Sequence, residues 1–328
     1  MCNSSGMRKF ILQILLFFIL LCIIALPVDY MTTKGLRKLS TIEFAVWNDI
    51  YNDNHMDNDL VVLGASTAWT GYNTYMMDSI LGISTYNLGV DGHPWYMYKV
   101  RYEVYREVAK APKYIVINLD KATFLDALDN PYMREQFLPY PRLMWKVRKD
   151  KEFSLIELCV PYYRYIGYKD LQKAGLQSYY DKPISCFDTS CNFYKGYWGQ
   201  DKKWSVEVFD STDITSAQEM SCSKLVQNDI ADFIQQRQDE GITVILCKYP
   251  LYRPYFENCR NIEEYQVICE DICKETGVVM YDFTDMLIVE DTAYFYNPTH
   301  LNLKGSTIFT NEFCAKLNEN ELNKEDNR

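Results

Sequence analysis

The sequence predicts a three-layer α/β domain with a parallel five-stranded sheet, preceded by an N-terminal membrane anchor. Five short apolar runs alternate with stretches of helical periodicity, which is the pattern of a parallel sheet covered by helices on both faces. An uncharged apolar run of 19 residues, Phe10–Val28, precedes the first of them. A long segment without this alternation, 121–215, follows the third run.

The predicted strands are continuous apolar runs, as strands buried on both faces require. They lie at 59–63, 84–87, 114–119, 242–247 and 278–281. Between them, apolar residues recur three or four positions apart, as at Met97, Val100 and Val104, and give each helix one buried face. This order of elements predicts a flavodoxin-like arrangement.

The segment Phe10–Val28 has the length of a transmembrane helix. It contains one strongly polar residue, Gln13, and no charge, and about 20 such residues cross the hydrocarbon layer. Arg8 and Lys9 precede it. A cleaved signal peptide is the alternative, but no A-x-A site follows the run. We therefore predict one uncleaved span, although basic residues on both sides of it leave its orientation open.

Changes in composition divide the chain into predicted parts. Residues 1–30 form the tail and anchor, 31–58 a connector, 59–318 the α/β domain, and 319–328 a disordered tail. The segment 121–215 is rich in aromatic residues and too long for a loop of a compact domain. We expect it to form a lid or a small inserted subdomain.

Composition and motifs argue against several functions. The formal charge, 34 − 44 = −10, argues against a protein that follows nucleic-acid phosphates. Three histidines and no Cys-x-x-Cys pair argue against a structural zinc site. No Gly-x-Gly-x-x-Gly or Walker loop follows the first strand, which argues against a nucleotide-binding domain. We predict no metal and no cofactor. Cys186 and Cys191 are close enough in sequence for a disulfide in an oxidising compartment.

Three segments gather residues suited to chemistry at the edge of the sheet where parallel strands end. Gly64–Thr67 and Asn87–His93 each follow a strand, and Asn297–Asn302 precedes the last helix. A serine on a tight strand-to-helix turn, such as Ser66, exposes its hydroxyl, and backbone amides at such turns can hold an oxyanion. A histidine closing over it, such as His300, can take the hydroxyl proton.

The order of these segments resembles that of the SGNH (GDSL-like) hydrolases. That family has a serine block after the first strand, a glycine block after the second, and a D-x-x-H block near the C-terminus. Gly64–Thr67 matches the first block, and Gly92 falls at the oxyanion glycine. Asn297-x-x-His300, followed by Leu-Asn-x-x-Gly305, is similar to the membrane-anchored branch typified by the D-alanyl-lipoteichoic acid biosynthesis protein DltD.

The resemblance implies a serine esterase or O-acyltransferase of cell-envelope polysaccharide or polyol, with its body outside the cytoplasm. Ser66 would be the nucleophile, His300 the base and Asn297 the residue that orients it. Gly92 and Asn118 would contribute to the oxyanion hole. The bilayer, an integral-membrane O-acyltransferase and an envelope glycan are the implied partners. The aromatic residues of 121–215 would help to bind the glycan.

The chain departs from the family pattern at two positions. Asn297 stands where the family has aspartate, and asparagine can orient an imidazole but cannot stabilise an imidazolium. Asp282, Asp285 and Asp291 are candidates for the missing carboxylate. The family's Gly-x-Asn-Asp block reads Asn118-Leu-Asp here. A catalytically weak or inactive SGNH-like scaffold, which binds a glycan or a membrane O-acyltransferase, is therefore the alternative.

Overall fold

The computed structural model describes residues 4–39, 42–52, 56–89, 91–121, 123–125, 134–149, 153–180, 193–205 and 219–322. The chain divides into two compact units. Unit 1 comprises Met1–Asn48 and Asp129–Ser185, and unit 2 comprises Asp49–Leu128 and Cys186–Arg328. Helix α2, Ile42–Asn52, crosses the boundary between them.

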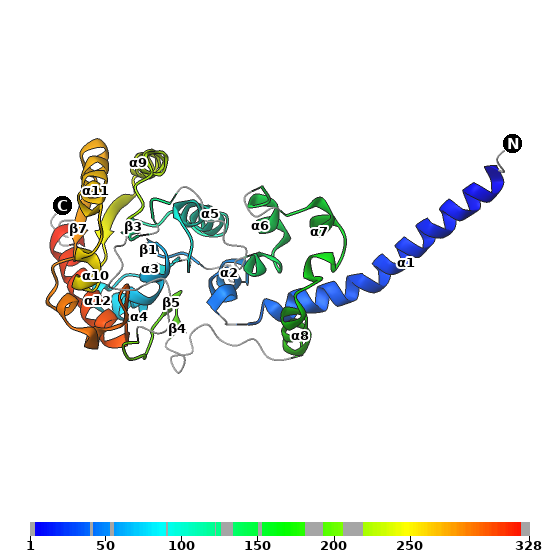
Figure 1. Ribbon diagram of the computed structural model, residues 1–328, viewed down its shortest axis with the longest axis horizontal. Coiled ribbons are helices and arrows are strands. Elements are labelled where there is room, and N and C mark those ends of the chain that lie inside the picture. Colours follow the sequence, from blue (N-terminus) through cyan, green and yellow to red (C-terminus); the bar gives the residue numbers. More distant parts are fainter. Residues whose placement is uncertain are drawn as a thin grey trace. The chain divides into compact units, whose positions relative to one another are not determined.

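Unit 2 is built on a parallel five-stranded sheet in the order β2-β1-β3-β6-β7, which confirms the predicted fold class (Figure 1). Val62 pairs with Val116, and Val116 pairs with Ile245, so β1, β3 and β6 form the centre of the sheet. Every residue of β1 and β3 is buried, because helices cover both faces. The strands are β1 Leu60–Leu63, β2 Thr85–Asn87, β3 Tyr114–Leu119, β6 Thr243–Lys248 and β7 Val279–Asp282.

Capping residues set the limits of several helices of unit 2. The Asn302 side chain accepts a hydrogen bond from the Gly305 amide at the start of α12, and Ser223 caps α9 in the same way. Gly277 ends α11 in the left-handed conformation, at φ 69°. The helices are α3 Ser66–Gly71, α4 Thr74–Leu81, α5 Trp95–Arg106, α9 Lys224–Asp239, α10 Arg253–Glu257, α11 Ile262–Thr276 and α12 Leu303–Leu317.

Two short antiparallel hairpins add to unit 2 beyond the five strands. One pairs β4, Phe193–Tyr194, with β5, Tyr197–Trp198. The other pairs β8, Phe295–Asn297, with β9, His300–Leu301. Strands of two or three residues leave no apolar run in the sequence. Single-turn elements near the C-terminus are η5 Leu287–Glu290, η6 Thr292–Tyr294 and η7 Asn318–Leu322.

Unit 1 joins the N-terminal helix to a group of short helices. Helix α1 continues past the predicted span and packs its last turns against α8, where a Cβ on Gly35 would lie 1.7 Å from the Gly175 carbonyl oxygen. An ion pair of 2.8 Å joins Asp29 of α1 to Arg164. The elements are α1 Ser4–Leu36, η2 Glu135–Phe137, α6 Pro141–Lys146, α7 Leu155–Cys159, η3 Tyr163–Tyr165 and α8 Lys169–Ser178.

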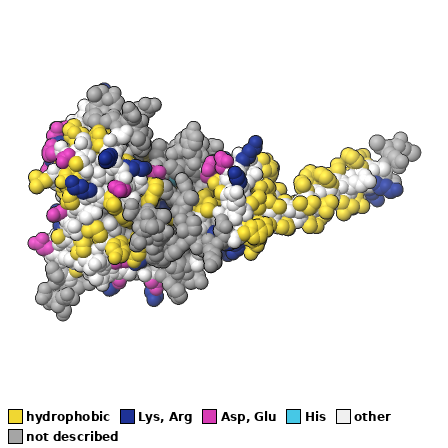
Figure 2. All heavy atoms as spheres, turned by 90° about the horizontal axis from the view of Figure 1, so that it is seen from below, with side chains coloured by type: hydrophobic (Ala, Val, Ile, Leu, Met, Phe, Trp, Pro, Cys, Tyr) yellow, Lys and Arg dark blue, Asp and Glu magenta, His cyan; other side chains and the backbone are white. Residues whose placement is uncertain are grey.

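The predicted span lies within α1. The stretch Gly6–Leu36 is long and apolar enough to cross a membrane, with a mean hydropathy of 3.0, and hydrophobic side chains cover its free part (Figure 2). A signal sequence near an N-terminus meets the same criteria. The predicted domain boundaries stay predictions, and Cys186 and Cys191 lie outside the described residues.

Candidate active site

Ser66 stands where β1 turns into α3, at the carboxyl edge of the sheet, and is half-buried. The turn depends on Gly64. A Cβ on this glycine would lie 2.5 Å from the Ala68 Cβ and 2.9 Å from the Asn118 Cβ, so a larger residue would push the helix from the strand. The Trp69 amide donates to the Ala65 carbonyl at 3.1 Å and closes the first turn.

The structure brings His300 and Asn297 to Ser66 from the other end of the chain. The His300 Nε2 atom lies 2.6 Å from the Ser66 Oγ atom. On the opposite side of the ring, His300 Nδ1 lies 2.9 Å from Asn297 Oδ1. The β8–β9 hairpin makes this possible, because it pairs residue 297 directly with residue 300.

The Asn297 side-chain oxygen has an unusual number of donors around it. The backbone amides of Thr299 and His300 each donate to Oδ1 at 3.0 Å, and the Thr299 hydroxyl donates at 3.2 Å. Two amide donors fix which end of the side chain is the oxygen, so His300 Nδ1–H donates to it, and Nε2 carries the lone pair that accepts from the Ser66 hydroxyl. The buried Asn297 Nδ2 atom has no hydrogen-bond partner among the described residues.

The surroundings of His300 keep its ring neutral. Burial lowers the pKa of His300 to about 4, and the positive charge of Lys202 acts in the same direction. The Tyr296 ring stacks on the imidazole, with centroids 5.3 Å apart and planes inclined by 22°. At neutral pH the ring is therefore in the state that accepts a proton, but the imidazolium that acceptance would create is disfavoured.

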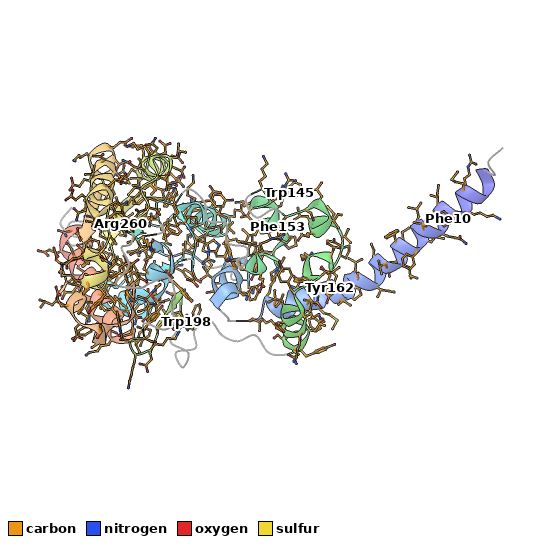
Figure 3. The ribbon with its side chains drawn as sticks, viewed as in Figure 1. Phe10, Trp145, Phe153, Tyr162, Trp198 and Arg260 are labelled. Carbon is orange, nitrogen blue, oxygen red and sulfur yellow. The ribbon has the colours of Figure 1, made fainter. Side chains whose placement is uncertain are left out.

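Aromatic residues and one lysine surround this group. The Trp69 and Trp198 rings lie 4.8 Å apart, and Figure 3 labels Trp198 in unit 2. Lys202 Nζ lies 5.8 Å from the Trp198 ring centroid and 5.4 Å from that of Tyr296. Sequence reasoning missed all four residues. Trp69 lies shortly after Ser66 in the sequence, and Tyr296 lies directly before Asn297. This proximity in sequence was the available signal for these two residues.

The segment 193–205 brings Trp198 and Lys202 to the site because it is fastened to several elements. The Asn87 amide, at the end of β2, donates to the Lys195 carbonyl at 2.9 Å. The Leu303 amide, at the start of α12, donates to the Gln200 carbonyl at 2.8 Å. The segment therefore belongs to the wall of the site.

Asn118 lies in a buried network next to the serine turn. Its Nδ2 donates to Thr67 Oγ1 at 2.9 Å, and its Oδ1 accepts from the Tyr72 hydroxyl at 3.0 Å. Thr67 Oγ1 in turn donates to Asp120 Oδ2 at 2.5 Å. These bonds hold the residue that follows Ser66, and none joins Asn118 to Ser66 or His300. Its role in an oxyanion hole stays a prediction.

Gly92 lies in the turn before α5, with φ at 62°. A positive φ at this turn suits glycine, which has no Cβ to clash. The negative charge of neighbouring Asp91 contributes, after burial, to the raised pKa of Tyr296, so this turn stands near the ring stacked on His300. The oxyanion role of Gly92 also stays a prediction.

The three aspartates considered as replacements for a carboxylate at position 297 make other interactions. Asp291 accepts from the Ala293 amide at 2.8 Å and caps η6. Asp285 pairs with Arg253 at 3.1 Å, and Asp282 with Lys248 at 3.2 Å. Among the described residues, no group of three or more His, Cys, Asp or Glu side chains is placed to hold a metal ion.

No family model and no curated protein matches the chain. Solved structures similar to it include a family two carbohydrate esterase from Clostridium thermocellum in complex with cellohexaose, and an active site mutant of a family two carbohydrate esterase from the same organism. Identities are 10% and 11%, TM-scores 0.35 and 0.34, and the matches cover 79% and 80% of this chain. The chain spans 63% of each of those proteins. Likeness at this level carries no argument about its chemistry.

Proposed function

We propose that this chain is a membrane-anchored serine esterase or O-acyltransferase of the SGNH type, acting on acyl esters of a cell-envelope polysaccharide or polyol. The observation that carries the proposal is the 2.6 Å contact between Ser66 Oγ and His300 Nε2. A hydroxyl nucleophile needs an adjacent base, and a base needs a group that orients it. His300 and Asn297 have the geometry for these two roles.

The proposed reaction has two halves. Ser66 Oγ attacks the acyl carbon while its proton moves to His300 Nε2; the carbon–oxygen bond to the alcohol breaks, and His300 returns the proton to the departing alkoxide. Water or a sugar hydroxyl then gives its proton to His300 and attacks the acyl-serine. Ser66 regains its proton as the acyl group leaves. The Ser66 and Gly92 amides would hold the oxyanion in both halves.

The described walls of the site support a glycan substrate. Trp69, Trp198 and Tyr296 provide flat apolar rings beside the reacting pair. Such rings combine a large contact area with little conformational freedom. An integral-membrane O-acyltransferase remains the proposed partner that delivers or accepts the acyl group.

The N-terminal helix supports a permanent anchor over a cleaved leader. Helix α1 is continuous from Ser4 to Leu36, and its last turns are part of the packing of unit 1. Asp29 accepts from the Tyr162 amide at 2.9 Å and pairs with Arg164. Cleavage within the apolar run would separate the packed last turns of α1 from the rest of the helix and create a new N-terminus at their start.

A non-catalytic scaffold is the second candidate, and a specific observation favours it. Asn297 offers no negative charge to an imidazolium, and burial with the charge of Lys202 lowers the pKa of His300 to about 4. In a serine protease, replacing the triad aspartate by asparagine costs about 10⁴ in turnover. A scaffold would keep its binding role without the Ser66 hydroxyl.

Covalent labelling distinguishes the two candidates. The full-length chain, in detergent, is treated with a fluorophosphonate and analysed by intact mass and peptide mapping. An active site gives one adduct, on Ser66, which His300→Ala abolishes. Ser84→Ala is the matched control, because the Ser84 hydroxyl is engaged with Asp59 at 2.9 Å. A folded wild-type chain without adduct contradicts the esterase and supports the scaffold.

A further inference from the structure

Unit 1 exposes an apolar surface formed mainly by α7 and the residues that follow it. Helix α7 has the sequence Leu-Ile-Glu-Leu-Cys, and none of its residues is buried. Leu158 and Cys159 line an open hollow together with Trp145 of α6. We call this surface the α7 face and define it by its exposed large apolar side chains: Trp145, Leu155, Ile156, Val160, Tyr163 and Ile166.

The exposed fractions on the α7 face are large. Ile166 is 62% exposed, Leu155 59% and Trp145 55%. Single exposed apolar residues are ordinary, but six of them between positions 145 and 166 mark a surface that another phase or molecule covers.

The charged residues within this part of the sequence turn away from the face. Glu157 is the only charged residue between positions 153 and 163. It pairs with Arg134 at 2.9 Å and accepts from the Ser154 hydroxyl at the start of α7. Arg164 is 6% exposed and pairs with Asp29 of α1 at 2.8 Å. Both charges of this stretch are thus paired inside unit 1, and the residues that define the face carry no charge.

The α7 face is fixed to α1 at the point where the apolar run ends. From Lys9 to Asp29 is 29 − 9 = 20 residues, and a helix of that length measures about 30 Å, the thickness of the hydrocarbon layer. Asp29 is the residue that Arg164 and the Tyr162 amide bind. Figure 1 shows α7 on the side of unit 1 toward the free end of α1. The face therefore stands at the level where α1 leaves the membrane.

Basic residues stand beside the face. Arg142 and Lys146 of α6 are exposed, and the Arg148 guanidinium lies 4.3 Å from the Trp145 ring centroid. Lys169 of α8 is also exposed. Figure 3 shows Trp145 and Tyr162 on this part of unit 1. Tryptophan and tyrosine at the level of the headgroups, with basic residues nearby, are typical of protein surfaces at a membrane boundary.

We propose that the α7 face lies in the interfacial layer of the same bilayer that α1 crosses, with the basic residues of α6 against lipid headgroups. The proposal rests on the membrane-anchor part of the proposed function and not on the chemistry of Ser66. Unit 1 then contacts the membrane at two places, the α1 span and the α7 face. The contact at the α7 face restricts how the anchored protein tilts about α1.

Quenching of tryptophan fluorescence by brominated lipid tests whether the α7 face contacts the bilayer. Helix α1 contains no tryptophan, so quenching in proteoliposomes reports on the body of the chain alone. The full-length protein is reconstituted in phosphatidylcholine brominated either near the headgroup end or near the methyl end of the acyl chain. We expect quenching, stronger with bromine near the headgroup. Trp145→Phe should lose most of it, and Trp204→Phe, the matched control in unit 2, should retain it.

Two results would overturn the proposal. Absence of quenching in pure lipid would mean that the face is not seated in the bilayer and would favour an integral-membrane protein as its occupant. Equal quenching of wild type and Trp145→Phe would place the contact elsewhere. The tryptophan fluorescence of Ser66→Ala must be quenched like that of the wild type. Failure of the proposed chemistry and failure of the proposed membrane contact are then separate results. Trp145 is 55% exposed, so Trp145→Phe should keep the native fold, and circular dichroism checks this.

Discussion

The two units of this chain differ in where they expose apolar side chains. In unit 2 the strands β1 and β3 are buried along their whole length, and the polar residues collect at the carboxyl edge of the sheet, around Ser66 and His300. In unit 1 the apolar helix α7 is exposed, while Glu157 and Arg164 turn inward to ion-pair partners. Unit 2 therefore keeps the apolar residues of its central strands inside, whereas unit 1 exposes those of α7.

The difference shows that hydrophobic pattern alone does not tell which side of an element is inside. Apolar residues avoid water, and a lipid layer satisfies them as well as a protein core does. Charged side chains are unfavourable both in a lipid layer and in a protein core unless they are paired. This explains why Glu157 and Arg164 have ion-pair partners. Four sets of variants test this contrast, and the largest expected effect comes first.

The strongest test of the polar edge of unit 2 is Ser66→Ala. We expect complete loss of the fluorophosphonate adduct and a fall in ester hydrolysis by a factor on the order of 10³ or more, since the proposed nucleophile is removed. Intact mass and turnover of an aryl acetate measure these. Adduct formation that persists in Ser66→Ala would place the reactive group elsewhere.

Stability compares the two units directly. Leu246→Ala, at a fully buried position of strand β6, should lower the free energy of unfolding by about 2–5 kcal/mol, because it leaves a cavity in the core. Ile156→Ala, at a position 52% exposed on α7, should change it by less than about 0.5 kcal/mol in detergent. Thermal unfolding of both variants measures the difference. Similar losses would show that α7 is packed after all, and the contrast between the units would fail.

Asn297→Asp tests whether the weak point of the site is its missing charge. The four donors around Oδ1 suit a carboxylate oxygen, and a carboxylate would stabilise the imidazolium and raise the pKa of His300. We expect labelling of Ser66 to accelerate by about 10- to 100-fold, a part of the factor known for the reverse change in a protease. Asn297→Ala, which removes the acceptor for His300 Nδ1, should slow it. A rate unchanged by the aspartate would favour the scaffold.

The smallest expected effect concerns pH and Lys202. The base form of His300 is required, so the labelling rate should rise with pH through about 4 and stay level from about pH 5 to pH 8. Lys202→Met should move the midpoint to slightly higher pH, because it removes a cation that opposes protonation. Lys203→Met, the neighbouring exposed lysine, is the control. A wild-type midpoint near the ordinary histidine value would contradict the description of the site.

The sequence predicted the fold and the proximity of Ser66 and His300 because the strands that position them have local signals. Runs such as Tyr114–Leu119 identify strands without knowledge of their neighbours, and the resulting order predicts that Ser66 and His300 meet at one edge. The hairpin that pairs residue 297 with residue 300 was not predicted, because its strands have two or three residues. Trp198 and Lys202 were missed for another reason: their place depends on hydrogen bonds to segments far away in the sequence.

By itself, then, the sequence predicted the parallel sheet and the apolar N-terminal helix, which depend on periodicity and composition, and it proposed Ser66, His300 and Asn297 as site residues from the order of three segments. Tertiary structure decided which groups surround His300, what Asn297 Oδ1 accepts, and which way α7 faces. The assembly of unit 1 shows why: Gly35 and Gly175 touch only when two distant helices pack. Contacts of that kind follow from the packing of the whole chain, and no local pattern of residues records them.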